Sequence, residues 1–138
     1  MMNTATPLIT AKLVSESKRL SILPRYTGKN FGSVEASIFN AMREYCSDYQ
    51  GGYWYMYELS NGAFYMAPGR DEMLPISCAG NYYDGSMTAD AAGLVASLVG
   101  INRVVWKTES QQLINLFYAL RDFALEHKEA KEIFKAID

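Results

Sequence analysis

Hydrophobic residues recur with helical spacing through the second half of the chain. The segment from Ala89 to Trp106 is apolar on more than one face, which predicts a helix at the centre of the core. Thr88 is a fitting N-cap for it, and Asp90 falls in its first turn, where a carboxylate complements the positive end of the helix dipole. A regular apolar stripe follows at Leu113, Leu116, Phe117, Leu120, Phe123, Ala124 and His127, and the pattern stays helical over residues 128–137.

The join between these helices carries a capping signal. Thr108-Glu109-Ser110-Gln111 matches the capping-box pattern, so either a new helix starts there or the long helix bends. In both cases the apolar stripes need a common partner. We expect one core, formed by the apolar face of a sheet together with Leu94, Leu98, Leu113, Leu116, Phe117 and Leu120.

The first half of the chain contains two weaker helical signals. Residues 15–18 favour a short helix that stops before Pro24, because the residue before a proline avoids helical torsions. Ser33 is a fitting N-cap for a second helix, which Gly51-Gly52 ends. Its apolar stripe is Val34, Ile38, Ala41, Met42 and Tyr45. Residues 28–33 before it are interpreted as a flexible entry loop. The alternative is that their backbone amides and Lys29 bind an anion at the start of the helix. The segment does not, however, match the phosphate-binding pattern GxxxxGK[ST].

The aromatic segment YWYMYELSNGAFYMAPG contains the signal for a β-hairpin. With Asn61-Gly62 as a two-residue type I′ turn, Leu59 pairs with Phe64 and Tyr57 with Met66. Alternation along the strands then places successive side chains on opposite faces. The predicted buried residues are Tyr55, Tyr57, Phe64 and Met66, and the predicted exposed ones are Trp54, Glu58 and Tyr65.

Two further short segments complete the predicted fold. Leu74, Ile76 and Cys78 alternate like a third strand, which Pro75 moves towards the edge of the sheet. Residues 81–86 are interpreted as a turn. The 138-residue chain suits one core. The sequence therefore predicts a single α+β domain over residues 1–138, with a small antiparallel β-sheet packed against several α-helices.

Charge excludes two classes of nucleic-acid function. Thirteen Lys and Arg oppose fifteen Asp and Glu, for a net charge of −2. A strong nucleic-acid binder concentrates basic residues, and a protein that imitates DNA needs a dense field of carboxylates. Residues 50–69 contain neither Lys nor Arg, whereas single-strand binders interleave such residues with their aromatics. The aromatic segment is therefore predicted to be core, not a stacking platform.

Location is predicted from two absences in the sequence. No apolar run approaches the roughly 18 residues that suggest a membrane span. The first residues, MMNTATPLITAKLV, have no basic cluster before an apolar stretch and no cleavage site. We expect a cytoplasmic protein that makes no membrane contact.

Few residues offer reactive chemistry. The single histidine, His127, lies on an apolar stripe near a helix end, where a packed or dipole-stabilised imidazole is expected. Cys46 and Cys78, in a predicted helix and strand, have no metal or redox spacing, and we expect two packed thiols and no bound metal or cofactor. The alternative is a small enzyme that uses clustered carboxylates, for which the candidates are Glu58, Asp71, Glu72 and Asp84.

Three segments resemble one known family. They are LPRYTGKNFG (23–32), GGYWYMYELSNGAFYMAP (51–68) and NYYDGSMTADAAGLVASL (81–98), which look like the ArdB/KlcA antirestriction proteins of plasmids and other mobile elements. The resemblance implies a compact α+β fold and protection of incoming DNA from host type I restriction systems, without a DNA-like acidic surface. It implies no catalytic residues.

Two functional hypotheses follow. The first is an interaction protein, not an enzyme, that binds the type I restriction-modification machinery or a host regulator of it, without binding DNA directly. The second is the carboxylate enzyme acting on a nucleotide or a host protein. The predicted interaction surface lies on the exposed side of the hairpin and at the following turn, and comprises Trp54, Glu58, Asn61, Tyr65, Asp84 and Gly85.

Overall fold

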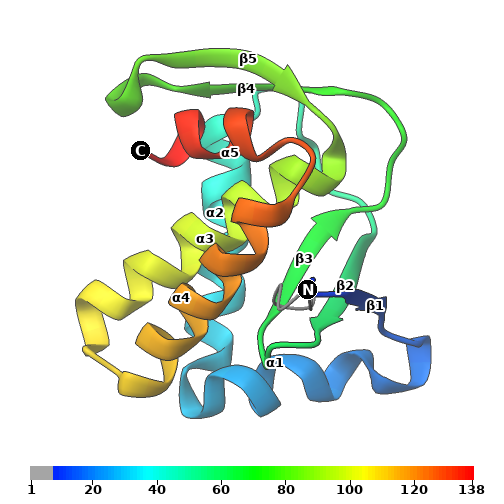
Figure 1. Cartoon of the computed structure of the whole chain (residues 1–138), viewed down its shortest axis with the longest axis vertical. Coiled ribbons are helices and arrows are strands. Elements are labelled where there is room, and N and C mark those ends of the chain that lie inside the picture. Colours follow the sequence, from blue (N-terminus) through cyan, green and yellow to red (C-terminus); the bar gives the residue numbers. More distant parts are fainter. Residues whose placement is uncertain (1–7) are drawn as a thin grey trace, which may run out of the picture.

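The computed structural model of the protein describes residues 8–138 (Figure 1). The prediction that residues 1–14 are no secretion signal therefore falls partly outside the described residues. The helices are α1 (Arg19–Thr27), α2 (Phe31–Tyr45), α3 (Ala89–Thr108), α4 (Gln111–Glu126) and α5 (Ala130–Ile137), with 3-10 turns η1 (Glu16–Lys18), η2 (Gly28–Asn30) and η3 (Ala79–Asn81). The strands are β1 (Ala11–Leu13), β2 (Trp54–Leu59), β3 (Phe64–Pro68), β4 (Leu74–Cys78) and β5 (Tyr83–Met87). The predicted α+β class is confirmed.

Helix α3 is the centre of the protein, as its apolar pattern predicts. It packs against α2, β3, α4 and α5 (Figure 1). One hydrophobic core joins it to the sheets and to the apolar stripes of α2 and α4. Among residues 8–138, α3 is the one helix with the length and hydropathy of a membrane span, and 67% of that window is buried inside the protein. We therefore interpret α3 as a core helix.

The free edge of β3 is covered by α3. The Ser97 hydroxyl accepts a hydrogen bond from the Met66 N–H and donates one to the Met66 carbonyl, both at 3.2 Å. Gly93 lets the two backbones approach, because a Cβ there would stand 2.4 Å from Ala67 Cα and 2.5 Å from the Met66 carbonyl oxygen. The helix thus satisfies an edge that would otherwise accept a further strand.

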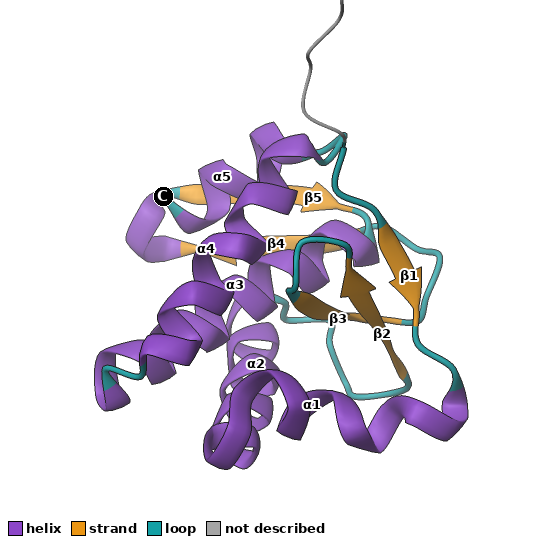
Figure 2. Cartoon of the chain, turned by 60° about the horizontal axis from the view of Figure 1, so that its bottom comes forward, coloured by secondary structure: helices purple, strands orange, loops and turns teal. Residues whose placement is uncertain are grey.

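Strands β4 and β5 form their own sheet, which corrects two predictions. The first sheet has the order β1-β2-β3, and the second pairs β4 with β5 (Figure 2). Residues 83–87 are therefore a strand and not part of a turn, and β4 does not join the hairpin. The turn is shorter than predicted because Tyr82 takes a left-handed conformation, with φ of 53°. Strand β5 has no alternating apolar run to reveal it, since only its ends, Tyr83 and Met87, are buried.

The hairpin register predicted from the sequence is wrong by one residue. Glu58 lies opposite Phe64 and Tyr57 opposite Tyr65. The loop has three residues, Ser60 to Gly62, with Gly62 at a φ of 88° and the Leu59 N–H bonded to the Ala63 carbonyl. This is the bulged hairpin loop that an Asn-Gly pair also favours.

A one-residue slip moves side chains of one strand to the opposite face. Trp54 is therefore buried at 3% exposure, while Tyr55 is 39% exposed. Tyr65 is also buried, because α3 and α4 cover its side of β3. Phe64 and Met66 are buried as predicted, and Tyr57 is half-buried.

Four helix boundaries also differ from the prediction. Helix α1 continues through Pro24, whose exposed ring lies one turn from the exposed Leu20, so the missing backbone bond is on the solvent side. Residues 28–33 are not a loop, because η2 and the first turn of α2 occupy them, and α2 ends at Tyr45, before Gly51. A new helix does start after α3, but its N-cap is Ser110, which accepts from the Leu113 N–H. The cap at Thr88 is confirmed.

We predict that Gly93→Ala destabilises the protein by about 1 to 3 kcal/mol, because the new methyl group collides with the backbone of β3. Gly32→Ala is the matched control, since Gly32 also lies in a helix and a Cβ there has no neighbour within 4 Å. That control should leave stability unchanged or raise it by up to about 1 kcal/mol. Chemical denaturation measures both, and equal stability of the two variants would contradict the close approach.

Candidate interaction site

The residues predicted for the interaction surface do not lie on one surface. Trp54 and Tyr65 are core residues, exposed by only 3% and 2%. Glu58 and Asn61 lie at the hairpin, whereas Asp84 and Gly85 lie on β5 in the second sheet. Exposure of Trp54 and Tyr65 is therefore ruled out, while a contact role for the other four remains a prediction.

Aromatic contacts explain why Trp54 and Tyr65 are buried. The Trp54 indole N–H donates to the Tyr49 hydroxyl at 2.8 Å, and its ring meets Phe39 edge-on with centroids 5.1 Å apart. Tyr65 stacks on Tyr57 at 4.9 Å and on Phe123 at 5.6 Å. These rings connect the hairpin to α2 and α4. They are core residues, as the absence of Lys and Arg from residues 50–69 predicted.

Asn61 lines a cleft between α1, the hairpin loop and α4, and Glu58 is bonded to two residues of that lining, Arg25 and Tyr26. The cleft has a volume of about 360 Å³, and its polar lining is Arg25, Tyr26, Asn61, Gln112 and Asn115. We call it the hairpin cleft. Two of the segments that carry the family resemblance meet here, since Arg25 and Tyr26 come from residues 23–32 and Asn61 from residues 51–68.

Glu58 is held as an ionised acceptor beside the cleft. Its Oε2 accepts from the Tyr26 hydroxyl at 2.6 Å and from Arg25 Nη1 at 3.0 Å. The hydrogen bond from Tyr26 and the charge of Arg25 hold the pKa of Glu58 below its usual value. Burial, with the Glu58 carboxylate beside it, raises the pKa of Tyr26 to about 12. Tyr26 is therefore a neutral donor and Glu58 a carboxylate at neutral pH.

The other side chains of the cleft are amides. Asn61 Nδ2 donates to the Ala119 carbonyl at 2.8 Å, which fixes the hairpin loop on α4. Asn115 Oδ1 accepts from Gln111 at 2.9 Å, which leaves its N–H groups as donors. Arg25 is 65% exposed and retains further guanidinium donors. The cleft is thus suited to bind carbonyl or carboxylate groups of a protein partner.

The carboxylates proposed for an enzyme are distributed over different elements. Glu58 lies on β2 and is held by Arg25 and Tyr26 of α1. Glu72 lies 3.6 Å from Arg70. Asp84 lies on β5 and lines a separate groove of about 460 Å³ with Glu44 and Ser77. Over residues 8–138 no three His, Cys, Asp or Glu side chains gather where they could hold a metal ion. Cys46 and Cys78 are free and buried, and burial raises the pKa of Cys78 to about 11.

His127 belongs to a polar network at the start of α3. Its Nε2 lies 2.8 Å from Asp90 Oδ2, and its Nδ1 accepts from the Glu129 N–H at 2.9 Å, which places the ring proton on Nε2. Asp90 also accepts from the Tyr65 hydroxyl at 2.7 Å. The network joins β3, α3 and the end of α4, and it uses His127 as a packed imidazole.

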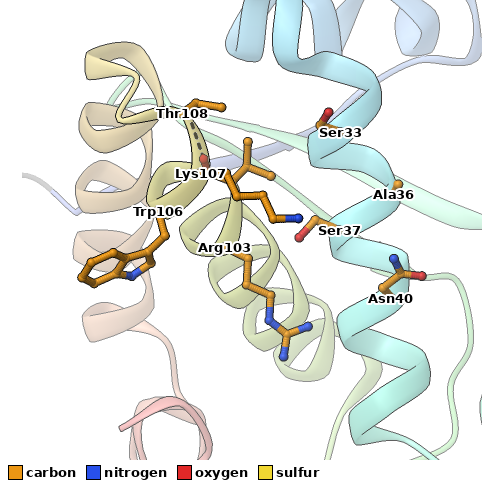
Figure 3. Close-up of a pocket in the computed structure, with 9 residues that line it drawn as sticks. Ser33, Ala36, Ser37, Asn40, Arg103, Trp106, Lys107 and Thr108 are labelled. Atoms are coloured by element: carbon orange, nitrogen blue, oxygen red, sulfur yellow. Dashed lines mark hydrogen bonds between the residues drawn. The ribbon is translucent and has the colours of Figure 1, made fainter.

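A second exposed region was missed by the sequence analysis. Trp106, near the end of α3, is 81% exposed, and Tyr118 on α4 is 60% exposed. The signal was the spacing of the buried residues: Ile101 and Val104 define the core side, and Trp106 falls off that stripe beside Lys107. Figure 3 shows Lys107 directed into a groove between α2 and α3, while Trp106 points away from it.

Comparison with known proteins defines the class. Residues 47–138 match the family model described as antirestriction protein. Two Escherichia coli proteins named antirestriction protein KlcA are 40% and 42% identical, over 99% and 94% of this chain and 100% and 94% of their own. The putative antirestriction protein YubI of E. coli K12 is 33% identical over 91% of the chain and 93% of its own length. The chain therefore belongs to the antirestriction proteins, and within them to the ArdB/KlcA family.

A solved structure agrees with this assignment. It superposes with a TM-score of 0.89 at 41% identity and covers 99% of this chain and 100% of its own. It is described as showing a novel fold for KlcA and ArdB, with antirestriction activity against type I DNA restriction systems in vivo but not in vitro. The resemblance inferred from residues 23–32, 51–68 and 81–98 is confirmed.

The network around Asp90 makes stability depend on pH. Burial alone would raise the pKa of Asp90, but the hydrogen bonds from His127 and Tyr65 outweigh it and hold the pKa below its usual value. Because the folded pKa is depressed, this stabilisation is present at neutral pH and is lost as the pH falls through the folded pKa.

We predict that Asp90→Asn lowers the free energy of unfolding at pH 7 by about 1 kcal/mol, less than the roughly 1.5 to 3 kcal/mol typical of a hydrogen bond to a charged group, because the Asp90 side chain is partly exposed. The difference from the wild type should shrink below about pH 4. Asp122→Asn, on the exposed side of α4, is the control and should change little. An Asp90→Asn variant that keeps the full acid sensitivity of the wild type would exclude this network as its source.

Proposed function

We propose that the protein protects unmodified incoming DNA from host type I restriction-modification systems. The observation that carries the proposal is the match along almost the whole chain to KlcA and ArdB, at a TM-score of 0.89 and 41% identity. The setting is a mobile element that enters a cell, and the site of action is the cytoplasm, where incoming DNA meets restriction. A fold maintained over nearly every residue supports a shared activity better than a match confined to one motif.

The protein acts without imitating DNA. A mimic competes for the basic groove of an enzyme through many aligned negative charges. Here the net charge is −2, and several carboxylates are already paired with Arg or Lys, including Glu44, Glu58, Glu72 and Glu132. These pairs come from different elements, so carboxylate charge among residues 8–138 is balanced locally at several places. The charge balance gives equally little support to direct DNA binding.

The antirestriction protein acts by binding another protein and is not an enzyme. Activity that is seen in cells but not in vitro, as described for KlcA and ArdB, is the behaviour of a protein that needs another cellular component. That component is the type I machinery itself or a host regulator of it. The hairpin cleft supplies one suitable surface, with a guanidinium, amide donors and the Glu58 carboxylate around it. Asp84 and Gly85 form a second predicted contact on β5.

We predict that the wild type raises the survival of unmodified phage or plasmid DNA in cells with an active type I system, and that Arg25→Ala lowers this protection by about tenfold or more. The reason is the loss of the exposed guanidinium at the cleft. Arg43→Ala is the matched control, because Arg43 is an exposed arginine whose side chain donates to Asn40 of its own helix. Survival counts with equal protein levels measure the effect.

Two outcomes would contradict the proposal in different ways. Full protection by a folded Arg25→Ala variant would remove the hairpin cleft from the function. Absence of protection by the wild type, across cells that carry different type I systems, would remove the antirestriction function itself.

A further inference from the structure

Trp106 is the largest apolar side chain that the described surface leaves in water. It is 81% exposed, whereas Trp54 is buried at 3%. An exposed tryptophan has a large apolar area with few rotatable bonds, which makes it a common anchor in protein interfaces. Its position near the end of α3 places it on the most buried helix of the protein.

Trp106 stands beside an apolar groove between α3 and α4. The groove has a volume of about 630 Å³ and is lined by Val105, Trp106, Ile114, Phe117 and Tyr118, with Asn102 and Glu109 as its polar members. Val105, Ile114 and Phe117 are half-buried, and Tyr118 is 60% exposed. Two neighbouring helices that leave an apolar trough between them form the recognised seat for an amphipathic helix.

The other side of Trp106 is polar and basic. A groove of about 620 Å³ between α2 and α3 is lined there by Arg103, Lys107, Ser33, Ser37 and Asn40 (Figure 3). Arg103 is paired with Glu44 at 2.9 Å, but Lys107 forms no ion pair with any residue from 8 to 138. Lys107 thus leaves one positive charge beside the tryptophan, on the opposite side from the apolar groove.

We infer that Trp106 and the α3–α4 groove form a docking surface for an amphipathic helix of a protein partner, with an acidic flank directed at Lys107. The apolar side chains of that helix fill the trough beside Ile114 and Phe117, and Trp106 packs against its side. The acidic flank passes over Trp106 and reaches Lys107. Peptide binding to this surface does not depend on the proposed function. Only the role of the surface in antirestriction rests on it.

The chemistry favours a protein helix over the other occupants. A nucleic acid would stack on Trp106, but the trough offers it apolar side chains and the Glu109 carboxylate where it needs cations. A second copy of the chain that packs through the same surface presents another groove and no protruding helix, so it leaves the trough unfilled. An acidic amphipathic helix satisfies both grooves at once.

The test uses two dye-labelled synthetic helical peptides that share one apolar stripe. One carries glutamates along its flank and the other carries lysines at the same positions. Fluorescence anisotropy should show that the glutamate peptide binds the wild type at least about tenfold more tightly than the lysine peptide. Lys107→Glu should reverse this preference, and Trp106→Ala should weaken binding of both peptides by about tenfold or more.

Control variants separate docking from folding. Tyr82→Asn removes another exposed aromatic residue, 97% exposed, and asparagine tolerates its left-handed backbone. It should bind both peptides like the wild type. Equal binding of the two peptides, or an unchanged preference in a folded Lys107→Glu variant, would overturn the acidic-helix assignment. Displacement of the peptide by a single-stranded oligonucleotide, or concentration-dependent dimers that Trp106→Ala abolishes, would assign the surface to those occupants instead.

A cellular arm keeps this inference distinct from the proposed function. In cells with a type I system, Trp106→Ala should reduce protection while Tyr82→Asn retains it. Peptide selectivity with no protection by the wild type would retain the docking surface and reject the antirestriction proposal. Protection that survives in Trp106→Ala, together with absence of peptide binding to the wild type, would reject the docking surface alone.

Discussion

The close approach of α3 to the edge of β3 determines much of the structure. At Gly93 the helix backbone comes so near to Met66 and Ala67 that even a methyl group does not fit. One turn later, the Ser97 hydroxyl takes the place of a neighbouring strand by bonding the Met66 N–H and carbonyl. The three-stranded sheet therefore ends at β3, and a helix occupies its edge. This explains why β4 pairs with β5 in a second sheet.

The same contact determines the surroundings of the hairpin. With α3 and α4 against β3, Tyr65 is enclosed between Tyr57 and Phe123 and its hydroxyl meets Asp90. Asp90 lies in the first turn of α3 and is held in turn by His127 at the end of α4. A register with Tyr65 outside would remove the Tyr65 hydroxyl from Asp90 and leave the carboxylate with the bond from His127 alone. Tertiary packing thus selects the bulged hairpin loop over the two-residue turn.

Sequence periodicity predicted the helical half well because long stripes are repeated over many residues. The cap at Thr88, the buried α3 and the stripe of α4 needed only local information. The hairpin register needed the helices that cover β3, and both loop lengths suit Asn61-Gly62. Strand β5 had no apolar alternation to reveal it, because the position between the exposed Asp84 and Ser86 is Gly85, which has no apolar side chain. Of the predicted surface, Asn61 does line a polar cleft and Glu58 is bonded to Arg25 of its lining, but Arg25 joins them only through tertiary folding.

The exposed sites are attached to hydrogen-bonded or buried parts of the molecule. Asn61 fixes the hairpin loop on the Ala119 carbonyl of α4, and Glu58 connects β2 to α1 through Tyr26. Trp106 lies on α3 two residues beyond the buried Val104. A surface held in this way loses little conformational entropy on binding, so a small interface can discriminate between partners by shape and charge. A near-neutral protein has little long-range electrostatic steering to use, and this kind of surface provides specificity without it.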